Sequence, residues 1–162
     1  MHELRVPAAA AKTEFYSELR VQLAALLEGE TDLIANTANM ASLLYHALPD
    51  VNWAGFYFLK GGELVLGPFN GKPACVRIAM SKGVCGSAAA AQESVLVADV
   101  YAFPGHIACD AASRSELVIP LIRNSEVLGV LDLDSPLPGR FTAEDQAGCE
   151  SLAETLLQSL LK

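Results

Sequence analysis

The sequence predicts an α+β domain in which helices flank a central antiparallel sheet of about six strands. Two runs with helical spacing open the chain, and a third closes it. Between them lie short runs rich in β-branched and aromatic residues, and pairs of these runs are joined by two-residue turns. Strands joined by such tight turns pair antiparallel. We expect the helices to pack against the sheet that these strands form.

Composition favours one folded domain over residues 1–162 and disfavours several function classes. Hydrophobic residues make up 52% of the chain, which is enough for a core, and charged residues make up 19%. The formal net charge is −8 without a basic patch, so we expect no nucleic-acid or anionic-membrane partner. Apolar stretches such as residues 117–122 are too short to span a bilayer, and the N-terminal residues lack the apolar core of a secretory signal. We therefore expect a cytoplasmic protein.

The first fifty residues predict two helices. Residues 12–27 are rich in helix formers, and Gly29 is typical of a helix stop. Thr31 is the expected N-cap of the second helix, and Pro49 marks its end. The positions of the second helix that recur at helical spacing are Leu33, Thr37, Met40, Leu44 and Ala47.

After Pro49 the pattern becomes that of strands. Residues 52–59 are rich in aromatic side chains, Gly61-Gly62 suits a two-residue turn, and residues 64–69 follow as the hairpin partner. Residues 74–80 predict a third short strand. This part of the chain therefore supplies one edge of the sheet.

A glycine-rich break and a long loop follow the third strand. Residues 83–87 interrupt the strand pattern, and Ser87 is the expected cap of a short helix over residues 88–91. Residues 95–97 predict another short strand. No periodicity survives from residue 99 to residue 113, and a loop of this length in a compact domain is usually functional.

A second hairpin and a helix complete the chain. Residues 116–123 and 126–134 flank Asn124-Ser125, which suits a tight turn. Thr142 is the expected N-cap of the last helix, whose first turn is acidic. That first turn carries Glu144 and Asp145, and one face of the helix carries Leu152, Leu156 and Leu160.

Four cysteines are the first candidates for chemistry, because cytosolic cysteines that pair usually do so transiently, in catalysis or sensing. Cys109 lies in the irregular loop, with His106 and Arg114 near it in sequence. Positive charge close to a thiol favours the thiolate, which is the nucleophile. The alternative for Cys109 is a small apolar side chain that fills a gap under the loop.

The other cysteines differ in their predicted surroundings. Cys75 lies on a predicted strand and Cys85 at a predicted helix start, where the helix N-terminus lowers a thiol pKa. Alone, each is more often a core residue, but with Cys109 they can form a nucleophile and its resolving partners. Cys149 lies on the apolar face of the last helix and is expected in the core. A zinc site of three cysteines and His106 is disfavoured, because no C-x-x-C pair is present.

An acidic group forms a second candidate site. The two-residue period of a strand puts Asp132 and Asp134 on one face and Leu131 and Leu133 on the other. Glu116, on the partner strand, can point to the same face as the aspartates. Clustered carboxylates repel one another, which keeps a proton available near neutral pH, and they can also bind an ammonium group. The alternative is a solvated strand face.

Aromatic residues on the first predicted strand form a third candidate. The strand period places Trp53 and Tyr57 on the same face. An aromatic wall suits a methyl thioether and a positive charge that develops on sulfur. The alternative is an ordinary core.

Several stretches that carry these residues resemble the free methionine-(R)-sulfoxide reductases, a family of GAF-domain enzymes. The matching stretches are Asn52-Trp53-Ala54-Gly55-Phe56-Tyr57, Gly71-Lys72-Pro73-Ala74-Cys75, Gly83-Val84-Cys85-Gly86, residues 103–110, Ser113-Arg114-Ser115-Glu116 and Leu131-Asp132-Leu133-Asp134. The specific part is the three-cysteine pattern, with gaps of ten and twenty-four positions (85−75 and 109−85). The resemblance implies a single GAF-like domain.

The resemblance also assigns roles. Cys109 matches the attacking cysteine, Cys75 the main resolving cysteine and Cys85 the third family cysteine, which can also form disulfides. The carboxylates that hold and protonate the substrate match Glu116, Asp132 and Asp134, and the aromatic side of the pocket matches Trp53 and Tyr57. The residues themselves leave open whether Cys75 or Cys85 resolves, and which carboxyl group donates the proton.

The implied reaction is the reduction of free L-methionine-(R)-sulfoxide through a sulfenic acid on Cys109 and an intramolecular disulfide. A thioredoxin-like donor would restore the thiols by exchange. No metal or organic cofactor is required, and the family commonly forms homodimers. The rival hypotheses are a non-catalytic GAF module that binds a small molecule and a redox sensor that uses the same thiols. Sensor modules usually lie in longer chains beside an output domain, so we expect a stand-alone enzyme.

Overall fold

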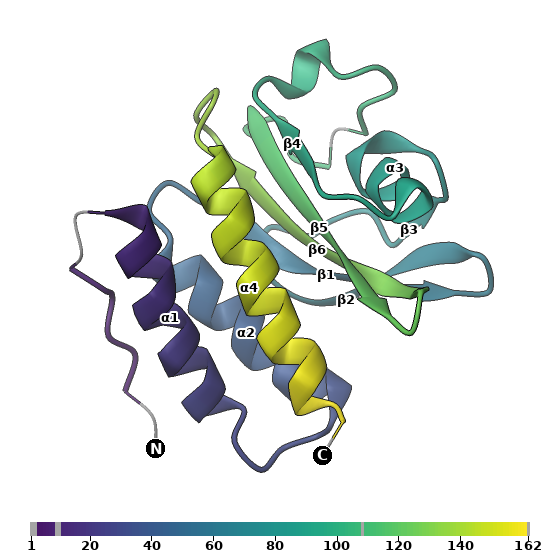
Figure 1. Ribbon diagram of the computed structural model, residues 1–162. Coiled ribbons are helices and arrows are strands. Elements are labelled where there is room, and N and C mark those ends of the chain that lie inside the picture. The colour runs from purple at the N-terminus through teal and green to yellow at the C-terminus, as the bar shows by residue number, and fades with distance from the viewer. Residues whose placement is uncertain (1–2, 9–10, 108, 162) are drawn as a thin grey trace.

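The computed structural model describes residues 3–8, 11–107 and 109–161, and its elements follow the predicted order (Figure 1). The helices within these residues are α1 (Lys12–Leu26), α2 (Leu33–Ala47), α3 (Gly83–Ala91) and α4 (Ala143–Ser159). The strands are β1 (Trp53–Lys60), β2 (Glu63–Gly71), β3 (Arg77–Ala79), β4 (Val95–Val97), β5 (Ser115–Arg123) and β6 (Glu126–Ser135). A 3-10 turn, η1 (Val100–Ala102), lies in the predicted loop.

Across the described residues, six strands form one antiparallel sheet in the order β3-β2-β1-β6-β5-β4, which confirms the predicted fold class. Both predicted hairpin turns are present. Gly61 and Gly62 have φ of 60° and 84°, and Asn124 and Ser125 have φ of 51° and 64°. Two successive positive φ angles match the twist of antiparallel strands, so these turns set the register of the two hairpins.

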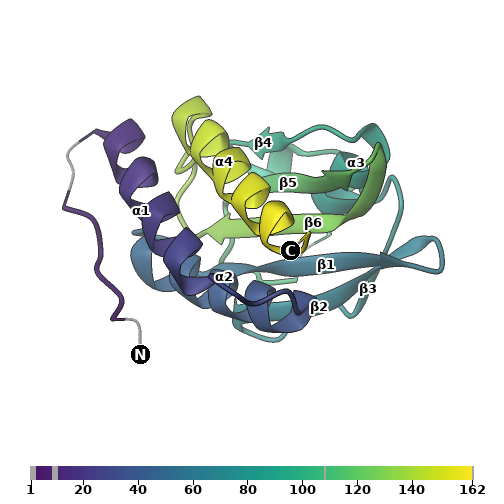
Figure 2. The ribbon, with the colours of Figure 1, turned by 60° about the horizontal axis from the view of Figure 1, so that its bottom comes forward.

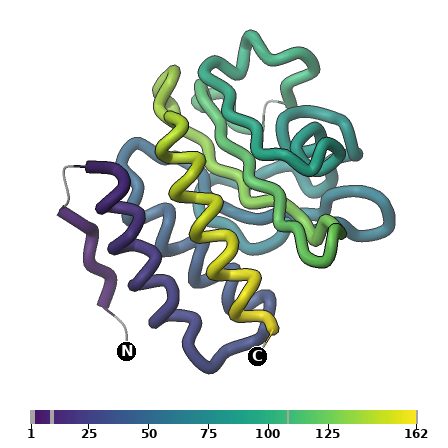
Figure 3. The backbone as a smooth tube through the Cα atoms, viewed as in Figure 1, coloured from purple at the N-terminus to yellow at the C-terminus, as the bar shows by residue number. Residues whose placement is uncertain are grey.

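Helices α1, α2 and α4 cover one face of the sheet (Figure 2). Helices α1 and α4 run side by side in the same direction, and α2 runs the opposite way (Figure 3). Hydrogen bonds support this arrangement, because Lys12 Nζ donates to Asp145 near the two helix starts, and Asn36 Nδ2 near the start of α2 donates to Ser159 Oγ at the end of α4. The main core lies between these helices and the sheet. None of the helices over the described residues combines the length and the apolar run that crossing a bilayer requires.

The opposite face of the sheet is covered by α3 and the loops that follow β2 and η1 (Figure 1). The strand period separates the two faces along each central strand. On β1, Phe56 and Phe58 belong to the main core, whereas Trp53 and Tyr57 face α3. Leu131 on β6 likewise faces the main core. One sheet therefore carries a core on one face and the candidate site on the other.

Two predicted helix caps were wrong. Asp32, not Thr31, is the N-cap of α2, and its side chain accepts a hydrogen bond of 2.8 Å from Ala35 N. Helix α3 begins at Gly83, so Ser87 lies inside it and donates to the Gly83 carbonyl oxygen at 2.6 Å. The sequence analysis expected the glycines of residues 83–87 to interrupt regular structure. Gly86 instead lets α3 pack closely on β3, because a Cβ at this position would collide with the backbone of β3.

The third strand is shorter than the predicted residues 74–80. Only Arg77–Ala79 pair with β2 as a strand. The carbonyl oxygen of Cys75 instead accepts a hydrogen bond from Tyr57 Oη at 3.0 Å. The segment before β3 therefore leaves the sheet and carries Cys75 over the site.

Candidate active site

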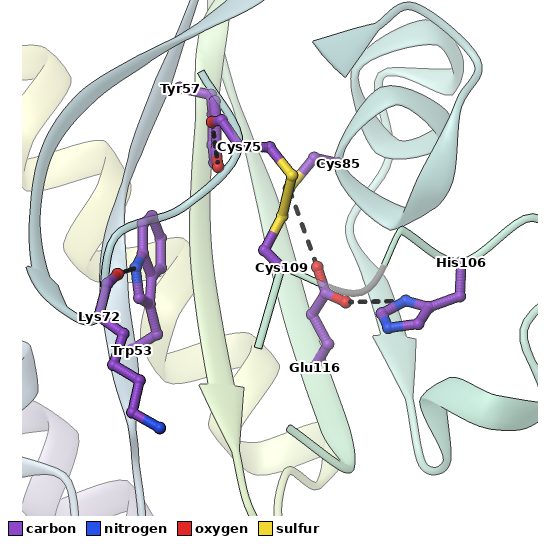
Figure 4. Close-up of a disulfide and its surroundings, with 8 residues drawn as sticks. All are labelled: Trp53, Tyr57, Lys72, Cys75, Cys85, His106, Cys109 and Glu116. Atoms are coloured by element: carbon purple, nitrogen blue, oxygen red, sulfur yellow. Dashed lines mark hydrogen bonds and ion pairs between the residues drawn. A yellow bond between two sulfur atoms is a disulfide. The ribbon is translucent and has the colours of Figure 1, made fainter. Parts of the chain in front are cut away.

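A disulfide joins Cys75 to Cys109, and their Cα atoms lie 5.9 Å apart (Figure 4). Cys75 is half-buried in the segment between β2 and β3, and Cys109 is exposed in the loop between η1 and β5. The two cysteines are separated by 34 positions in the sequence. The structure thus brings together two of the three cysteines of the predicted pattern. It also rules out the packing alternative for Cys109, because that side chain is exposed.

Three carboxyl groups lie on the face of β5 and β6 that faces α3. Glu116 pairs with Asp134 across the two strands, and Val118 pairs with Asp132. Glu116 and Asp132 are each 6% exposed, and Asp134 is half-buried. The solvated-face alternative was therefore wrong, because two of the three carboxyl groups are withdrawn from water.

Burial holds protons on this acidic group. Burial, and then repulsion from Asp132 and Asp134, raises the pKa of Glu116 well above its ordinary value. Burial, Asp132 and Asp110 likewise raise the pKa of Asp134. Burial raises the pKa of Asp132 to about 6, a rise that hydrogen bonds from Glu116 and Cys85 partly offset. At neutral pH the group can therefore donate a proton and still present a charged oxygen.

Trp53 and Tyr57 are buried in the core on the α3 face of the sheet, where they also line the cavity described below and anchor the chain. The rings of Trp53 and Tyr57 stack with centroids 5.9 Å apart. Trp53 Nε1 donates to the Lys72 carbonyl oxygen at 3.1 Å, and Tyr57 Oη donates to the Cys75 carbonyl oxygen. Sequence reasoning missed this second role, because it depends on backbone atoms of a segment with no periodic signal.

These groups line one small cavity of about 40 Å³. The predicted residues that line it are Trp53, Tyr57, Cys85, Cys109, Glu116, Asp132 and Asp134. Sequence reasoning missed Lys72, Lys82, Asp110 and Ser113, which also line it. Within the cavity wall, Asp132 Oδ1 is buried without a hydrogen-bond partner. A space of this size holds only a few water molecules, so the disulfide-linked form leaves little room for a ligand.

Comparison with known proteins identifies the family. The GAF domain family matches residues 35–160. A protein of Escherichia coli K12 described as free methionine-R-sulfoxide reductase is 53% identical over 145 residues, which cover 90% of this chain and 88% of the relative. The chain belongs to the free methionine-R-sulfoxide reductase family.

Solved structures of relatives agree with this family fold. The X-ray structure of free methionine-R-sulfoxide reductase from Neisseria meningitidis in complex with its substrate is 41% identical, with a TM-score of 0.94. It covers 99% of this chain, which covers 96% of that one. A Burkholderia vietnamiensis structure described as a GAF sensor protein is 53% identical, with a TM-score of 0.90, and the match covers 94% of this chain and 100% of that one. The fold is therefore that of a GAF domain.

The third cysteine of this reductase family member is a buried thiol. Cys85 is 4% exposed, and its Sγ donates to Glu116 Oε1 at 3.9 Å. Burial, and then repulsion from Asp132 and Glu116, raises its pKa well above the ordinary value. The expectation that the helix N-terminus would lower this pKa was wrong, because desolvation and the neighbouring carboxylates outweigh the helix dipole.

The two basic residues near Cys109 in sequence contribute less positive charge than expected. Arg114 Nε lies 3.9 Å from Asp99, and its guanidinium lies over the Tyr101 ring at 5.1 Å, so this side chain is engaged away from the cavity. His106 Nδ1 lies 3.9 Å from Glu116 Oε2, and burial lowers its pKa. The lowered pKa of His106 weakens it as a positive partner for Glu116.

The last two sequence expectations concern Cys149 and a zinc site. Cys149 is fully buried against Tyr16, which confirms its place in the core of this family member. The zinc site that the sequence disfavoured would use Cys75, Cys85, Cys109 and His106. In this structure Cys75 and Cys109 form a disulfide with each other, so their sulfur atoms are not free to bind a metal. Within the described part of the chain, the donor atoms grouped closely enough for a cation come from Cys85, Glu116 and Asp132.

Proposed function

We propose that this protein reduces free L-methionine-(R)-sulfoxide to L-methionine with electrons from thiols. The observation that carries the proposal is a disulfide between an exposed and a half-buried cysteine beside a buried acidic group, in which burial raises the pKa of Glu116. A reaction that takes oxygen from a sulfoxide needs two electrons and two protons, and these are the groups that supply them. Membership of the reductase family supports the same substrate.

The first step forms a sulfenic acid. With the disulfide reduced, the Cys109 thiolate attacks the sulfoxide sulfur, and Glu116 or one of the aspartates donates a proton to the oxygen. Methionine leaves with its sulfur reduced by two electrons, and Cys109 is oxidised to the sulfenic acid. The raised pKa of Glu116 supports it as the proton donor at neutral pH.

The second step forms the disulfide. The Cys75 thiol attacks the sulfenic sulfur of Cys109, an S–S bond forms, and the oxygen leaves as water. The Cys75–Cys109 pairing supports Cys75 as the resolving residue. Cys85 stays as a second partner that can exchange into the disulfide, although its buried, protonated thiol reacts more slowly.

Substrate recognition uses the two faces of the cavity. The substrate ammonium group would lie against the charged oxygens of Asp132 and Asp134, where Asp132 Oδ1 has no other partner. Trp53 and Tyr57 would hold the methyl thioether end. A peptide-bound residue has no free ammonium group, so these contacts favour the free amino acid.

The wider setting is part of the same proposal. Residues 1–162 form a single GAF-like domain that acts as a homodimer in the cytoplasm. A thioredoxin-like dithiol reduces the Cys75–Cys109 disulfide after each turnover. The chemistry uses the chain's own thiols and carboxyl groups.

A coupled assay tests the function. Thioredoxin, thioredoxin reductase and this protein should oxidise NADPH when free methionine-(R)-sulfoxide is added, and much more slowly with the S epimer or an N-acetylated substrate. A non-catalytic GAF sensor would bind methionine or its sulfoxide without consuming NADPH. A redox sensor would consume one equivalent of NADPH and then stop. Either of these two results would contradict the proposed activity.

A further inference from the structure

Exposed apolar side chains lie close in sequence to both cysteines of the disulfide. Val76, which follows Cys75, is 64% exposed, and Ile107, two positions before Cys109, is 37% exposed. Pro73 on the same segment as Cys75 is exposed as well. Pro73 and Ile107 also line the cavity, and exposed apolar side chains next to a site are typical of a protein-binding surface. We call Pro73, Val76 and Ile107 the apolar rim of the disulfide.

Charge near the apolar rim is mostly paired. Residues 64–92 contain no aspartate or glutamate, and their basic residues are Lys72, Arg77 and Lys82. Lys72 Nζ lies 3.8 Å from Asp110, and Arg77 Nη1 lies 2.6 Å from Glu63. The rim therefore offers a partner mainly apolar contacts.

The two cysteines of the disulfide are held differently. The segment with Cys75 is anchored to the sheet by three hydrogen bonds, from Tyr57 Oη to the Cys75 carbonyl, from Trp53 Nε1 to the Lys72 carbonyl and from Leu66 N to the Val76 carbonyl. Cys75 is half-buried, whereas Cys109 is exposed. An attacking thiolate must approach along the S–S axis, so access favours Cys109 as the sulfur attacked.

We propose that the apolar rim is the docking surface of a protein dithiol of the thioredoxin type, and that this partner attacks Sγ of Cys109. The proposal rests on the proposed function, since it identifies where the reductant binds. The partner's thiolate forms a bond to Cys109 Sγ, the Cys75–Cys109 bond breaks, and the electron pair leaves on Cys75, which takes up a proton. The partner's second thiol then displaces Cys109, so that the partner leaves as a disulfide and both enzyme thiols are reduced.

Reduction of the oxidised protein, measured without methionine sulfoxide, tests the docking surface. The second-order rate constant is compared for reduced thioredoxin and for dithiothreitol, which needs no docking surface. Val76→Asp should lower the rate with thioredoxin about tenfold and leave the rate with dithiothreitol within about twofold. Val21→Asp is the matched control, because Val21 is 66% exposed on α1. Equal thioredoxin rates for Val76→Asp and the unaltered protein would overturn the proposal.

A trapping experiment tests which sulfur is attacked. Thioredoxin whose second active-site cysteine is replaced by serine cannot finish the exchange, so it stays bound as a mixed disulfide. Mass spectrometry of the trapped complex should find thioredoxin on Cys109 and a free thiol on Cys75. A complex through Cys75, or no complex with a protein that dithiothreitol readily reduces, would show that the assignment is wrong. Because neither experiment uses methionine sulfoxide, failure of the proposed activity would leave both results interpretable.

Discussion

The burial of Glu116 lowers the stability of the fold, and the proposed reaction uses its raised pKa. The folded protein holds its proton above the ordinary pKa of 4.5, because burial and the two aspartates disfavour its charge. The unfolded chain releases that proton near pH 4.5. The stability of the fold must therefore decrease as the pH rises from about 4.5 through the folded-state pKa.

Glu116→Gln should make the protein more stable and less active. The amide keeps the shape without a charge, so the free energy of unfolding at pH 7 should rise by about 1–2 kcal/mol, and its decrease above pH 4.5 should become flatter. Loss of the proton donor should lower kcat about 10²–10⁴-fold. Urea unfolding from pH 4 to pH 8 and single-turnover methionine release measure the two effects. Glu126→Gln, at an exposed position, is the control for both.

The cysteines should separate into three classes in single-turnover experiments. Cys109→Ser should release no methionine, because it removes the nucleophile, whereas Cys75→Ser should release one methionine per site and then recycle poorly with thioredoxin. Cys149→Ala should lower stability by about 1 kcal/mol without changing turnover, since Cys149 only fills the core. Normal turnover by Cys109→Ser, or loss of turnover in Cys149→Ala alone, would refute these roles.

For single residues, the sequence predicted the side chains whose placement follows from strand geometry. It did not predict those whose surroundings depend on burial and tertiary contacts. The two-residue period correctly placed Asp132 and Asp134 on one face with Glu116. It could not show that Arg114 binds Asp99 instead of supporting Cys109, because the loop between them has no repeating geometry. The burial of Cys85 among carboxylates likewise depends on contacts between distant elements.

At the element scale, α4 depends on one buried carboxylate. Thr142 N donates to Asp145 at 2.8 Å, as a capping residue does, and Tyr16 Oη and Lys12 Nζ donate to the same carboxylate at 2.8 Å and 2.6 Å. Burial alone would raise the pKa of Asp145, but these donors and Arg140 lower it below the ordinary 3.8. Asp145 therefore caps α4 and joins it to α1.

Asp145→Ala should destabilise the protein by about 2–4 kcal/mol at neutral pH, because it leaves buried donors without a partner. A carboxyl group with a lowered pKa stabilises the fold above pH 3.8, and that stabilisation is lost as the pH falls through the folded-state pKa. The difference between the variant and the unaltered protein should therefore shrink in acid. Chemical unfolding at several pH values measures it, with Glu154→Ala on the exposed side of α4 as the control. A difference that stays constant down to pH 2 would contradict the pairing.

Elements with a strong local signal were predicted to within a few residues, and those set by tertiary contact were not. Helix α4 and both hairpins carry their caps and turns in the sequence, and they form as predicted. Helix α3 was misread because its glycines admit close contact with β3, which no local pattern shows. The short β3 reflects the hydrogen bond between Tyr57 and Cys75.

At the scale of the whole molecule, the redox state should control access to the cavity. The disulfide ties the loop with Cys109 to the segment with Cys75, and the cavity beside it has a volume of only about 40 Å³. Methionine, with nine heavy atoms, cannot enter a space of a few water molecules. Reduction should remove this link and leave the loop held by weaker polar contacts, such as Asn52 Nδ2 to Ser113 Oγ at 3.4 Å and Lys72 Nζ to Asp110 at 3.8 Å.

The reduced protein should therefore bind methionine, and the disulfide-linked protein should bind it at least about tenfold more weakly. Isothermal titration calorimetry of the two forms at pH 7 measures the difference. The reduced form of Glu126→Gln should match the reduced unaltered protein, since Glu126 is exposed at the start of β6 and does not line the cavity. Equal affinities in the two redox forms would show that the loop opens without reduction.

The burial of the two unpaired cysteines makes the molecule a reporter of its own redox state. In the disulfide-linked form, Cys85 and Cys149 are 4% and 0% exposed, and the other two cysteines have no free thiol. An alkylating reagent such as iodoacetamide would therefore leave the native oxidised protein almost unlabelled. After reduction, Cys109 becomes an exposed thiol and should take up label first. The mass added by brief labelling would then measure directly, in a cell extract, what fraction of the protein is ready for its next turnover.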